Sequence, residues 1–482
     1  MGLLVISIPA VQNHLANRLT QNINQNFQTD LKVEGVAIGF DGTVNLASFF
    51  IADHRSDTLF YAKKFKTDLY SLGQWVNGNL FFSTTEFEDI FLKITQYEGE
   101  ENNSLFQFTD KLLAHAEPQS DRSVFVRIDN LNVTDGRFLM VDKNRPSKPL
   151  QFEQINLKAN DFFLVNDGLE VALKNLKFDS EDYGNINLNE AEFYYNPCMI
   201  GFPSFRLSSG QTHIGGNISL LLPNGNFQEF LDLAQINMNI NGLFSSQQLN
   251  NFIDLPEDFQ PLEITLSATG SPNELIITNL EVNQEVIQLK AKLDLKEAFS
   301  DAPVKASVFM EDFKIISSKL TQIIPVSFHD LIPKPFLNYQ PFVCSGTFSL
   351  EENQLRTDLQ LTNGNAHIKN QSLFNITANQ GKLKLNRFEG ISEIKKFDLS
   401  PWHPKLGWVT SKFRISGGRG DSENFNFNFD VGVDEIFIDE KAINHINFKG
   451  NIKEEELTID LKVTDEYVIC LLYTSDAADE ED

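Results

Sequence analysis

The residues that most often carry catalysis or metal binding are not arranged for it in this chain. The eight histidines are scattered, and none pairs as HxH, HxxxH or HExxH, the spacings that bring two imidazoles to one metal ion. The motifs GxSxG, GxGxxG and GxxxxGKS/T do not occur. Carboxylates are numerous but evenly spread, so no glycosidase-type pair can be selected. We predict that the chain is not an enzyme and has no catalytic residues, no metal site and no cofactor.

Two short polar motifs have a structural explanation. The tripeptide Arg419-Gly420-Asp421 matches a cell-adhesion motif, but the preceding Gly417 and Gly418 favour a hairpin loop. The stretch HRSD, from His54 to Asp57, gathers titratable groups on a predicted turn. Nothing in the sequence supports a catalytic role for it.

The three cysteines are Cys198, Cys344 and Cys470, far apart and without a CxxC. This spacing predicts neither a structural zinc site nor a disulfide framework. We expect Cys198 and Cys344 to be small buried hydrophobes.

The most distinctive pattern is apolar. In the stretch NFNFNFDVGV, apolar side chains occupy alternate positions, with Asn and Asp in most of the gaps: Phe425, Phe427, Phe429, Val431 and Val433. A period of two residues is typical of a β-strand with one apolar face and one polar, solvent-exposed face. Because side chains two apart share a face, these five residues are our candidates for lining an apolar groove and contacting lipid.

The same alternation continues beyond residue 30. Roughly thirty short strands fit it, among them VFVRIDNLNVTDGRFLMVD, INLKANDFFLV, QINMNINGLF, LEITLSATG and IQLKAKLDL. Turn signals separate them at Asp135-Gly136, Asp167-Gly168, Asn224-Gly225 and Asn363-Gly364. We predict a mainly β fold, with more than half of residues 30–465 in strands.

The first thirty residues are different. The stretch GLLVISIPA is apolar but far shorter than the ~20 residues of a spanning helix, so we interpret residues 1–10 as the remnant of a membrane anchor. An apolar residue then recurs every four positions and predicts an amphipathic helix over 11–28: Val11, Leu15, Leu19, Ile23 and Phe27. A packing face is favoured over a partner-binding role for this stripe.

Composition limits the partners. The chain has 42 Phe and a formal net charge of −26. This acidity argues against nucleic acid, whose phosphates demand a basic surface, and against adsorption to anionic membranes. The acidic residues are explained most simply as keeping a Phe-rich β protein soluble.

The second half contains a loose internal repeat. The stretches that begin at Leu249 and Phe328 each indicate a short helix or turn, a Pro, a strand, a Gly and another strand. Gly270 and Gly346 occupy the matching glycine positions. A weaker third copy runs from FDLSPWHP to FNFNFDVGV. A long period, in strands that cannot bury one face alone, predicts a stacked array.

The first hundred residues carry a specific order of features. In chain order these are Pro9, Val11 and Gln12; Gly35, Val36 and Ile38; Asp57, Thr58, Leu59, Phe60 and Ala62; and the Leu-rich turn from Leu69 to Leu72. This order resembles the N-terminal part of the TamB and AsmA-like envelope proteins of bacteria. In that family a membrane helix ends near Pro-x-Val-Gln, a strand pair contains Gly-Val-x-Ile, and Asp-Thr-Leu-Leu-x-Ala follows. A Leu-rich turn then leads to a strand, which here begins after Gly78. From residue 120 to about 465 the resemblance rests on alternating strands and interspersed glycines.

The resemblance implies an elongated, curved β-sheet groove, a β-taco or β-helix-like array of repeats. It implies a periplasmic protein that is anchored in the bacterial inner membrane and conducts lipids to the outer membrane, with phospholipid acyl chains in its groove. The alternatives are an assembly factor for outer-membrane β-barrel proteins or autotransporters, acting with a BamA/TamA-type barrel, and an extracellular β-helical polysaccharide-binding protein or adhesin. A closed β-sandwich or β-helix core would use the same apolar residues without any groove.

On this basis the chain divides into an anchor remnant (1–10), an amphipathic helix (11–28), an N-terminal AsmA/TamB-like β-region (29–118), a β-groove segment (119–248), repeated β-groove modules (249–468) and a tail (469–482). The tail, from Cys470 onward CLLYTSDAADEED, breaks the strand pattern. CLLYTS back-translates into a sequence like a transposon-end sequencing adapter, so we interpret the tail as non-native rather than as a natural acidic extension. We expect the native gene to encode apolar residues before Met1 and further strands after Val468.

Overall fold

The structure is a computed structural model with two compact units, Met1–Gln228 and Glu229–Asp482. It describes residues 20–21, 24, 30–39, 43–69, 79–100, 102–108, 125–144, 148–165, 168–181, 184–196, 198–223, 230–250, 255–256, 259–297, 302–324, 329, 332–379, 382–419, 425–439, 441–453, 456–465 and 469–475. Strands make up 75% of it, which confirms the mainly β prediction. The units divide at Gln228, whereas the sequence pattern placed a boundary after residue 248.

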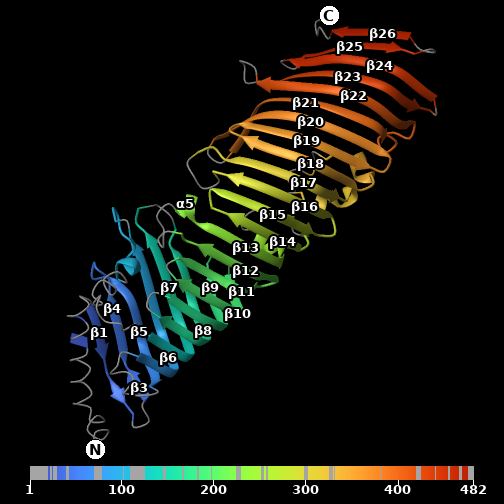
Figure 1. The fold of residues 1–482 in the computed structure, drawn as a ribbon. Coiled ribbons are helices and arrows are strands. Elements are labelled where there is room, and N and C mark those ends of the chain that lie inside the picture. The colour runs from blue at the N-terminus through green and yellow to red at the C-terminus, as the bar shows by residue number, and fades with distance from the viewer. Residues whose placement is uncertain are drawn as a thin grey trace, which may run out of the picture. The chain divides into compact units, whose positions relative to one another are not determined.

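The first unit is a curved sheet (Figure 1). Its strands are β1 (Asp30–Glu34), β2 (Ala37–Ile38), β3 (Thr43–Leu46), β4 (Ser48–Ala52), β5 (Thr58–Leu69), β6 (Asn79–Gln96), β7 (Phe125–Asp142), β8 (Leu150–Val165), β9 (Gly168–Ser180), β10 (Gly184–Asn196), β11 (Met199–Ser209) and β12 (Thr212–Leu221). From β7 to β12 each strand pairs antiparallel with the next. Strand β5 pairs with β3, β4 and β6.

The pairing of β6 with β7 is parallel, which the sequence pattern did not indicate. A parallel pair needs a connection that returns the chain to the same end of the sheet. Residues 104–108 within this connection are helical. Ser104 is 1% exposed, and its hydroxyl accepts a hydrogen bond of 2.9 Å from the backbone N–H of Thr95 on β6. The crossover segment is therefore held against the strand that precedes it.

The HRSD stretch forms the turn between β4 and β5, and this turn contacts the start of the β6–β7 connection. Asp53, just before it, is 8% exposed. Its Oδ1 accepts the backbone N–H groups of Arg55 and Asp57, both at 2.9 Å, and its Oδ2 accepts the Tyr97 hydroxyl at 2.7 Å. Burial, followed by the hydrogen bond to Asp53, raises the pKa of Tyr97, so its hydroxyl stays protonated to donate.

The crossover also contributes Glu100 to this turn. Its carboxylate contacts His54 Nε2 at 2.8 Å and Arg55 Nη2 at 2.5 Å. The hydrogen bond from Arg55 is the main cause of a lowered pKa for Glu100. The titratable residues of HRSD thus join two connections of the sheet, a structural role that agrees with the turn predicted there.

Several strands are longer than the sequence suggested because β-bulges replace some predicted turns. Asp135-Gly136 was expected to be a turn, but it lies inside β7, where the register shifts between Val133 and Gly136. Asp135 has a φ of 57°. Some bulges, like the tight hairpin turns, contain a residue in the left-handed region, so this local signal does not distinguish the two. The Asn363-Gly364 turn is confirmed, since Asn363 ends one strand and Ala366 begins the next.

The second unit is also a curved, open sheet. Its strands are β13 (Gln235–Phe244), β14 (Leu262–Gly270), β15 (Glu274–Asn283), β16 (Ile287–Lys296), β17 (Lys305–Ile315), β18 (Phe342–Glu351), β19 (Gln354–Asn363), β20 (Ala366–Asn379), β21 (Lys382–Asp398), β22 (Leu406–Arg419), β23 (Phe425–Ile438), β24 (Lys441–Lys453), β25 (Glu456–Thr464) and β26 (Ile469–Ser475). Each pairs antiparallel with the next. No pairing among the described residues joins β13 to β26, so this sheet is not closed on itself.

Short helical segments lie in several connections of the second unit. Helix α5 (Phe230–Leu233) precedes β13, and α6 (Ser246–Leu249) follows it. The 3₁₀ segments η1 (Ser317–Gln322) and η3 (Lys334–Asn338) lie between β17 and β18. A turn around Trp402 lies between β21 and β22. The connections with α6, with η1 and η3, and with the Trp402 turn are therefore four strands apart and lie at one end of the sheet, because successive antiparallel strands alternate direction.

Other sequence predictions fall at the ends of the chain. The helix expected over 11–28 lies almost wholly outside the described residues, of which only Thr20, Gln21 and Asn24 are helical, so it stays a prediction. In the tail, Ile469–Ser475 forms β26 and pairs with β25, although the sequence had indicated a break in the strand pattern there. Arg419 of the Arg419-Gly420-Asp421 motif is the last residue of β22, and its pairing with Phe425 agrees with a hairpin. Gly420 and Asp421 lie outside the described residues.

Candidate functional site

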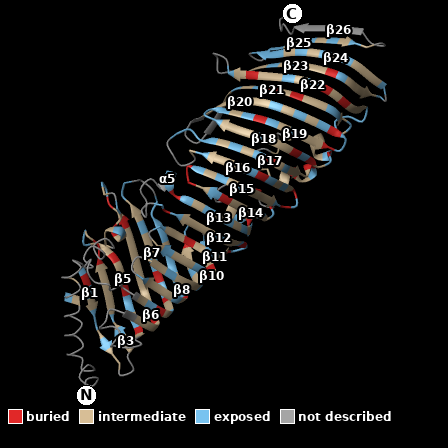
Figure 2. Cartoon of the chain, viewed as in Figure 1, coloured by how far each residue is buried: buried red, intermediate tan, exposed pale blue. Residues whose placement is uncertain are grey.

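The strands of the second unit have one polar and one apolar face. In β13, exposed Gln235, Asn237 and Asn239 alternate with half-buried Ile236 and Met238. Cross-strand ion pairs lie on the polar face, such as Lys292–Glu311 at 2.7 Å and Lys412–Glu393 at 2.6 Å. Figure 2 shows the alternation as exposed and intermediate bands along many of the strands.

The apolar face forms a cavity of about 730 Å³ across β15–β21. Every residue around it is apolar except Ser317. Three neighbouring strands supply most of the lining at alternate positions: Leu289, Ala291 and Leu293 on β16; Val308, Met310, Phe313 and Ile315 on β17; Phe342, Cys344 and Phe348 on β18. The volume falls within the ~300–1,000 Å³ range of small-molecule sites, large enough to receive an acyl chain.

Bulges keep the apolar residues on this face. Met310 and Phe313 both line the cavity although they are three apart, and strict alternation would put them on opposite faces. The register of β17 with β18 shifts between these two residues, which restores the phase. A shift between Ile277 and Leu280 acts in the same way on β15.

The connection between β17 and β18 covers one end of the cavity. Leu320 from η1 and Phe336 from η3 are part of the lining. The Phe336 ring stacks on Phe342 at the start of β18, with centroids 5.0 Å apart. The sequence pattern predicted a short helix or turn before β18. It did not indicate that this segment lines the apolar face, because η1 and η3 are too short to show helical periodicity.

In both predicted repeats, a side-chain amide at or just after the end of a neighbouring strand donates a hydrogen bond to the long connection. The side-chain amide of Gln284, after β15, donates to the carbonyl of Gln260 at 2.8 Å. Asn363, at the end of β19, donates to the carbonyl of Gln340 at 2.5 Å. Gln260 and Gln340 each stand before a Pro that leads into the strand, β14 or β18. Gly270 lies ten residues after Gln260 and Gly346 six after Gln340, so an alignment on the Gln-Pro pair does not match the two glycines. Both glycines nevertheless have a positive φ, of 120° and 141°.

A hydrogen-bonded aromatic cluster joins the last two long connections. Tyr339 is 7% exposed, and its ring stacks on Phe397 with centroids 5.0 Å apart. Its hydroxyl donates to the carbonyl of Asp398 at 2.6 Å and accepts from Trp402 Nε1 at 3.0 Å. Burial raises the pKa of Tyr339, so the hydroxyl remains a donor at neutral pH.

Replacing Tyr339 with Phe is expected to destabilise the second unit by about 1–2 kcal/mol, because the carbonyl of Asp398 and the indole N–H lose a partner while the ring packing survives. Thermal melting measures this as a fall of a few °C. Tyr195→Phe in the first unit, where the ring is 36% exposed, should leave the melt unchanged. An unchanged melt for Tyr339→Phe would show that the cluster does not hold the connections.

The sequence-predicted residues lie further along the same face, on β23. The ring centroids of Phe427 and Phe429 are 6.1 Å apart, so both rings lie on one side of the strand. Phe427 contacts Phe388 on β21 at 5.9 Å, and Phe429 contacts Phe448 on β24 at 6.0 Å.

The other three predicted residues belong to the same strand. Val431 pairs with Phe413 on one side and with Phe448 on the other. Val433 is 9% exposed. Phe425 begins β23, and its side chain lies outside the described residues.

The apolar face is half-buried rather than sealed. Phe427, Phe429 and Val431 are all of intermediate exposure, as are Phe313 and Phe348 in the cavity. Among the described residues, the large side chains with less than 2% exposure include only two aliphatic ones, Leu59 and Val286. A closed sandwich would bury these rings fully. The face is therefore accessible to a ligand.

The cysteines behave differently from one another. Cys344 is 7% exposed and lines the cavity, as expected of a small buried hydrophobe, and burial raises the pKa of its thiol. Cys198 is exposed, which corrects the prediction made for it. It lies in the turn between β10 and β11, where Asn196 Oδ1 accepts its backbone N–H at 3.0 Å. The apolar residues that follow Cys198 in the sequence do not show that Cys198 itself lies in a turn.

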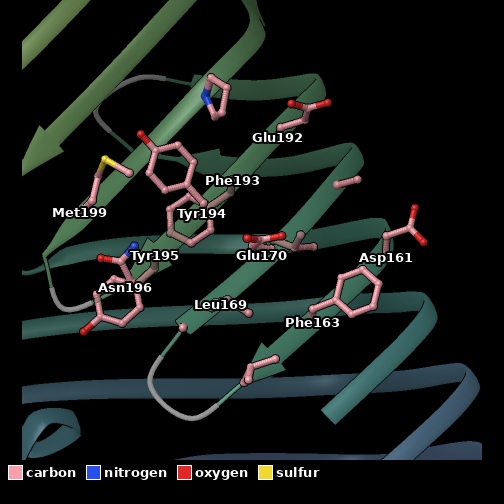
Figure 3. Close-up of a pocket in the computed structure, with 15 residues that line it drawn as sticks. Asp161, Phe163, Leu169, Glu170, Glu192, Phe193, Tyr194, Tyr195, Asn196 and Met199 are labelled. Carbon is pink, nitrogen blue, oxygen red and sulfur yellow. The ribbon is translucent and has the colours of Figure 1, made fainter. Parts of the chain in front are cut away.

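A second pocket, of about 680 Å³, lies on the first unit across β8–β11 (Figure 3). Its labelled side chains include the aromatic rings of Phe163 and Tyr194 and the carboxylates of Asp161, Glu170 and Glu192. Tyr194 packs across Gly201, where a Cβ would stand 2.6 Å from the Tyr194 hydroxyl. This pocket mixes acidic and aromatic groups, unlike the uniformly apolar cavity of the second unit.

Other classes of site are not formed by the described part of the chain. It brings no three His, Cys, Asp or Glu side chains together in a way that could hold a metal ion. None of its helices has the length and hydrophobicity that crossing a bilayer requires. Comparison of the chain with protein-family models, with curated proteins and with solved structures finds no match.

Proposed function

We propose that this protein is a bacterial envelope protein whose apolar sheet face conducts lipids between the inner and outer membranes. The single observation that carries the proposal is the open, half-exposed apolar face of the second unit. It combines the cavity on β15–β21 with the Phe-rich strands β21–β24. Such a face offers acyl chains many weak contacts, each favourable by about 25 cal/mol per Å² of apolar area removed from water.

The polar face supports the same proposal. Its Asn residues and ion pairs keep the outer side of the sheet in water, so a lipid on the inner side is shielded without a closed tunnel. The net charge of −26 disfavours adsorption of the sheet to anionic bilayers and thereby favours a role between membranes. The periplasmic location and an inner-membrane anchor are part of the proposal and follow from the resemblance of the first hundred residues.

Photo-crosslinking in cells tests this function. A benzoylphenylalanine at position 427 should yield lipid adducts, identified by mass spectrometry after purification. The same residue at Asn428, which is exposed on the polar face of β23, is the matched control and should yield none. Adducts with nascent outer-membrane proteins at position 427 would instead favour the assembly-factor alternative. Equal lipid labelling at both positions would contradict conduction along the apolar face.

A further inference from the structure

The apolar face of the second unit carries one hydrogen-bonding interruption. Five uncharged polar side chains lie together on β19–β22, at positions where alternation would place apolar residues: Thr357, Asn370, Ser372, Ser392 and Ser411. We call this set the polar cluster. Pairing places Thr357 beside Ser372, and Asn370 beside Ser392. Asn370 is two residues from Ile368, a lining residue of the cavity, so the cluster shares that face.

The polar cluster is partly bonded within itself. Asn370 Nδ2 donates to Ser392 Oγ at 2.8 Å, and Ser372 Oγ donates to Asn370 Oδ1 at 3.0 Å. Gly390 makes room for this arrangement, because a Cβ there would stand 2.6 Å from Ser372 Oγ. The cluster is thus an ordered group rather than a set of unrelated side chains.

Several of its hydroxyl groups keep hydrogen-bonding capacity. Ser392 is 4% exposed and accepts from Asn370, but within the described residues its own O–H donates to no protein group. Thr357 and Ser411, 9% and 7% exposed, have hydroxyls without a protein partner in that same part of the chain. A hydroxyl can both donate and accept, so a ligand on this face could accept hydrogen bonds from all three groups.

The cluster directly adjoins the apolar cavity. Leu359 lines the cavity and is the cross-strand partner of Asn370. Directly paired side chains have Cβ atoms ~5 Å apart, so one amphiphile can place its chain in the cavity and its first polar group on the cluster.

The chemistry of the cluster selects the polar group. No charged side chain belongs to it, and Arg356 and Arg414 lie at the alternate positions that face the other side of the sheet. A carboxylate or phosphate would meet no cation there, within a chain of net charge −26. Hydroxyl and amide groups suit instead an ester carbonyl and a neighbouring hydroxyl.

From this juxtaposition we infer that the second unit has a binding site for a neutral acylglycerol, with the fatty chain in the cavity and the glycerol ester on the polar cluster. The inference rests on the proposed function, since it assumes that acyl chains enter the face. The acylglycerol site would be a defined binding site, with a preferred head group, on a face that otherwise binds acyl chains without preference.

Displacement of Nile red from the purified full-length protein tests the site. The competitors are 1-monooleoylglycerol, oleate and 1-octadecene, at about pH 8, where oleate is ionised. The monooleoylglycerol should compete about tenfold more strongly than the other two, as expected when it completes one or two hydrogen bonds. Ser392→Ala and Asn370→Leu should abolish this preference and leave competition by octadecene unchanged. Gln360→Leu, exposed on the polar face of β19, is the matched control and should keep the preference.

The outcomes separate the two proposals. If octadecene competes but the glyceride is no better, or if the preference survives in Ser392→Ala, the acylglycerol site is overturned while acyl binding stands. If oleate competes best, a neutral head group is the wrong assignment. If the protein binds neither Nile red nor any competitor, the proposed lipid function fails together with the site. Thermal melting accompanies each variant, and Ser392→Ala alone decides the test if Asn370→Leu does not fold.

Discussion

Replacing Phe427 with Asp is expected to reduce lipid passage by about tenfold or more, because an unpaired carboxylate on an acyl path is strongly disfavoured. Phe427 sits between Phe388 and Phe429, at ring distances of 5.9 and 6.1 Å, in the middle of the Phe-rich part of the face. A charge there holds water and separates the apolar surface on its two sides. Lipid transfer between donor and acceptor vesicles, measured with the purified protein, reports the effect.

The same substitution should leave the second unit folded. Because the face is half-exposed, the new carboxylate can stay hydrated, and the main loss is two aromatic contacts worth about 0.5–1.5 kcal/mol each. Thermal melting should therefore fall by only a few °C. Asn428→Asp on the polar face is the control for added charge and should change neither transfer nor melting. A collapsed melt for Phe427→Asp would identify Phe427 as ordinary core and remove the support for a groove.

Replacing Asp53 with Ala is expected to destabilise the first unit by about 3 kcal/mol or more, the largest stability effect that we anticipate. The carboxylate accepts two backbone N–H groups of the HRSD turn and the Tyr97 hydroxyl. Its removal leaves the buried Tyr97 hydroxyl without its acceptor, at a cost of about 1–3 kcal/mol, and takes the acceptor from two part-buried backbone N–H groups that hold the turn. Equilibrium unfolding in urea, followed by a probe placed in the first unit, measures the change.

Two further variants serve as comparisons for Asp53→Ala. Tyr97→Phe removes one of the three bonds and should cost about 1 kcal/mol. Glu98→Ala, at an exposed neighbouring position, should stay within about 0.5 kcal/mol of the parent chain. If Asp53→Ala were no worse than Glu98→Ala, the HRSD turn would not hold the β6–β7 crossover, and the titratable residues there would need another explanation.

The local pattern of the sequence predicted those features that depend on neighbouring residues alone. The alternation in β13 and in β23 identified both strands and which of their residues share a face. The bounds predicted from LEITLSATG are those of β14, Leu262–Gly270. The turn at Asn363-Gly364 followed from residue types that accept a left-handed conformation. In each case the period of two, imposed by backbone geometry, is visible within a few residues.

Tertiary structure alone decided features that depend on residues far apart in the chain. The alternation of residues in β6 and β7 does not show that the two strands pair in parallel. The Asp135-Gly136 dipeptide lies in a bulge, although the same residue types are typical of a hairpin turn. The phase of Met310 and Phe313 follows from a register shift against β18, not from their own spacing. The exposure of Cys198 depends on a turn between two strands, and the cavity combines strands with η1 and η3 from one long connection. The sequence determined that a strand has an apolar face; only the pairing of many strands determined that the face stays open, because burial depends on what packs above it.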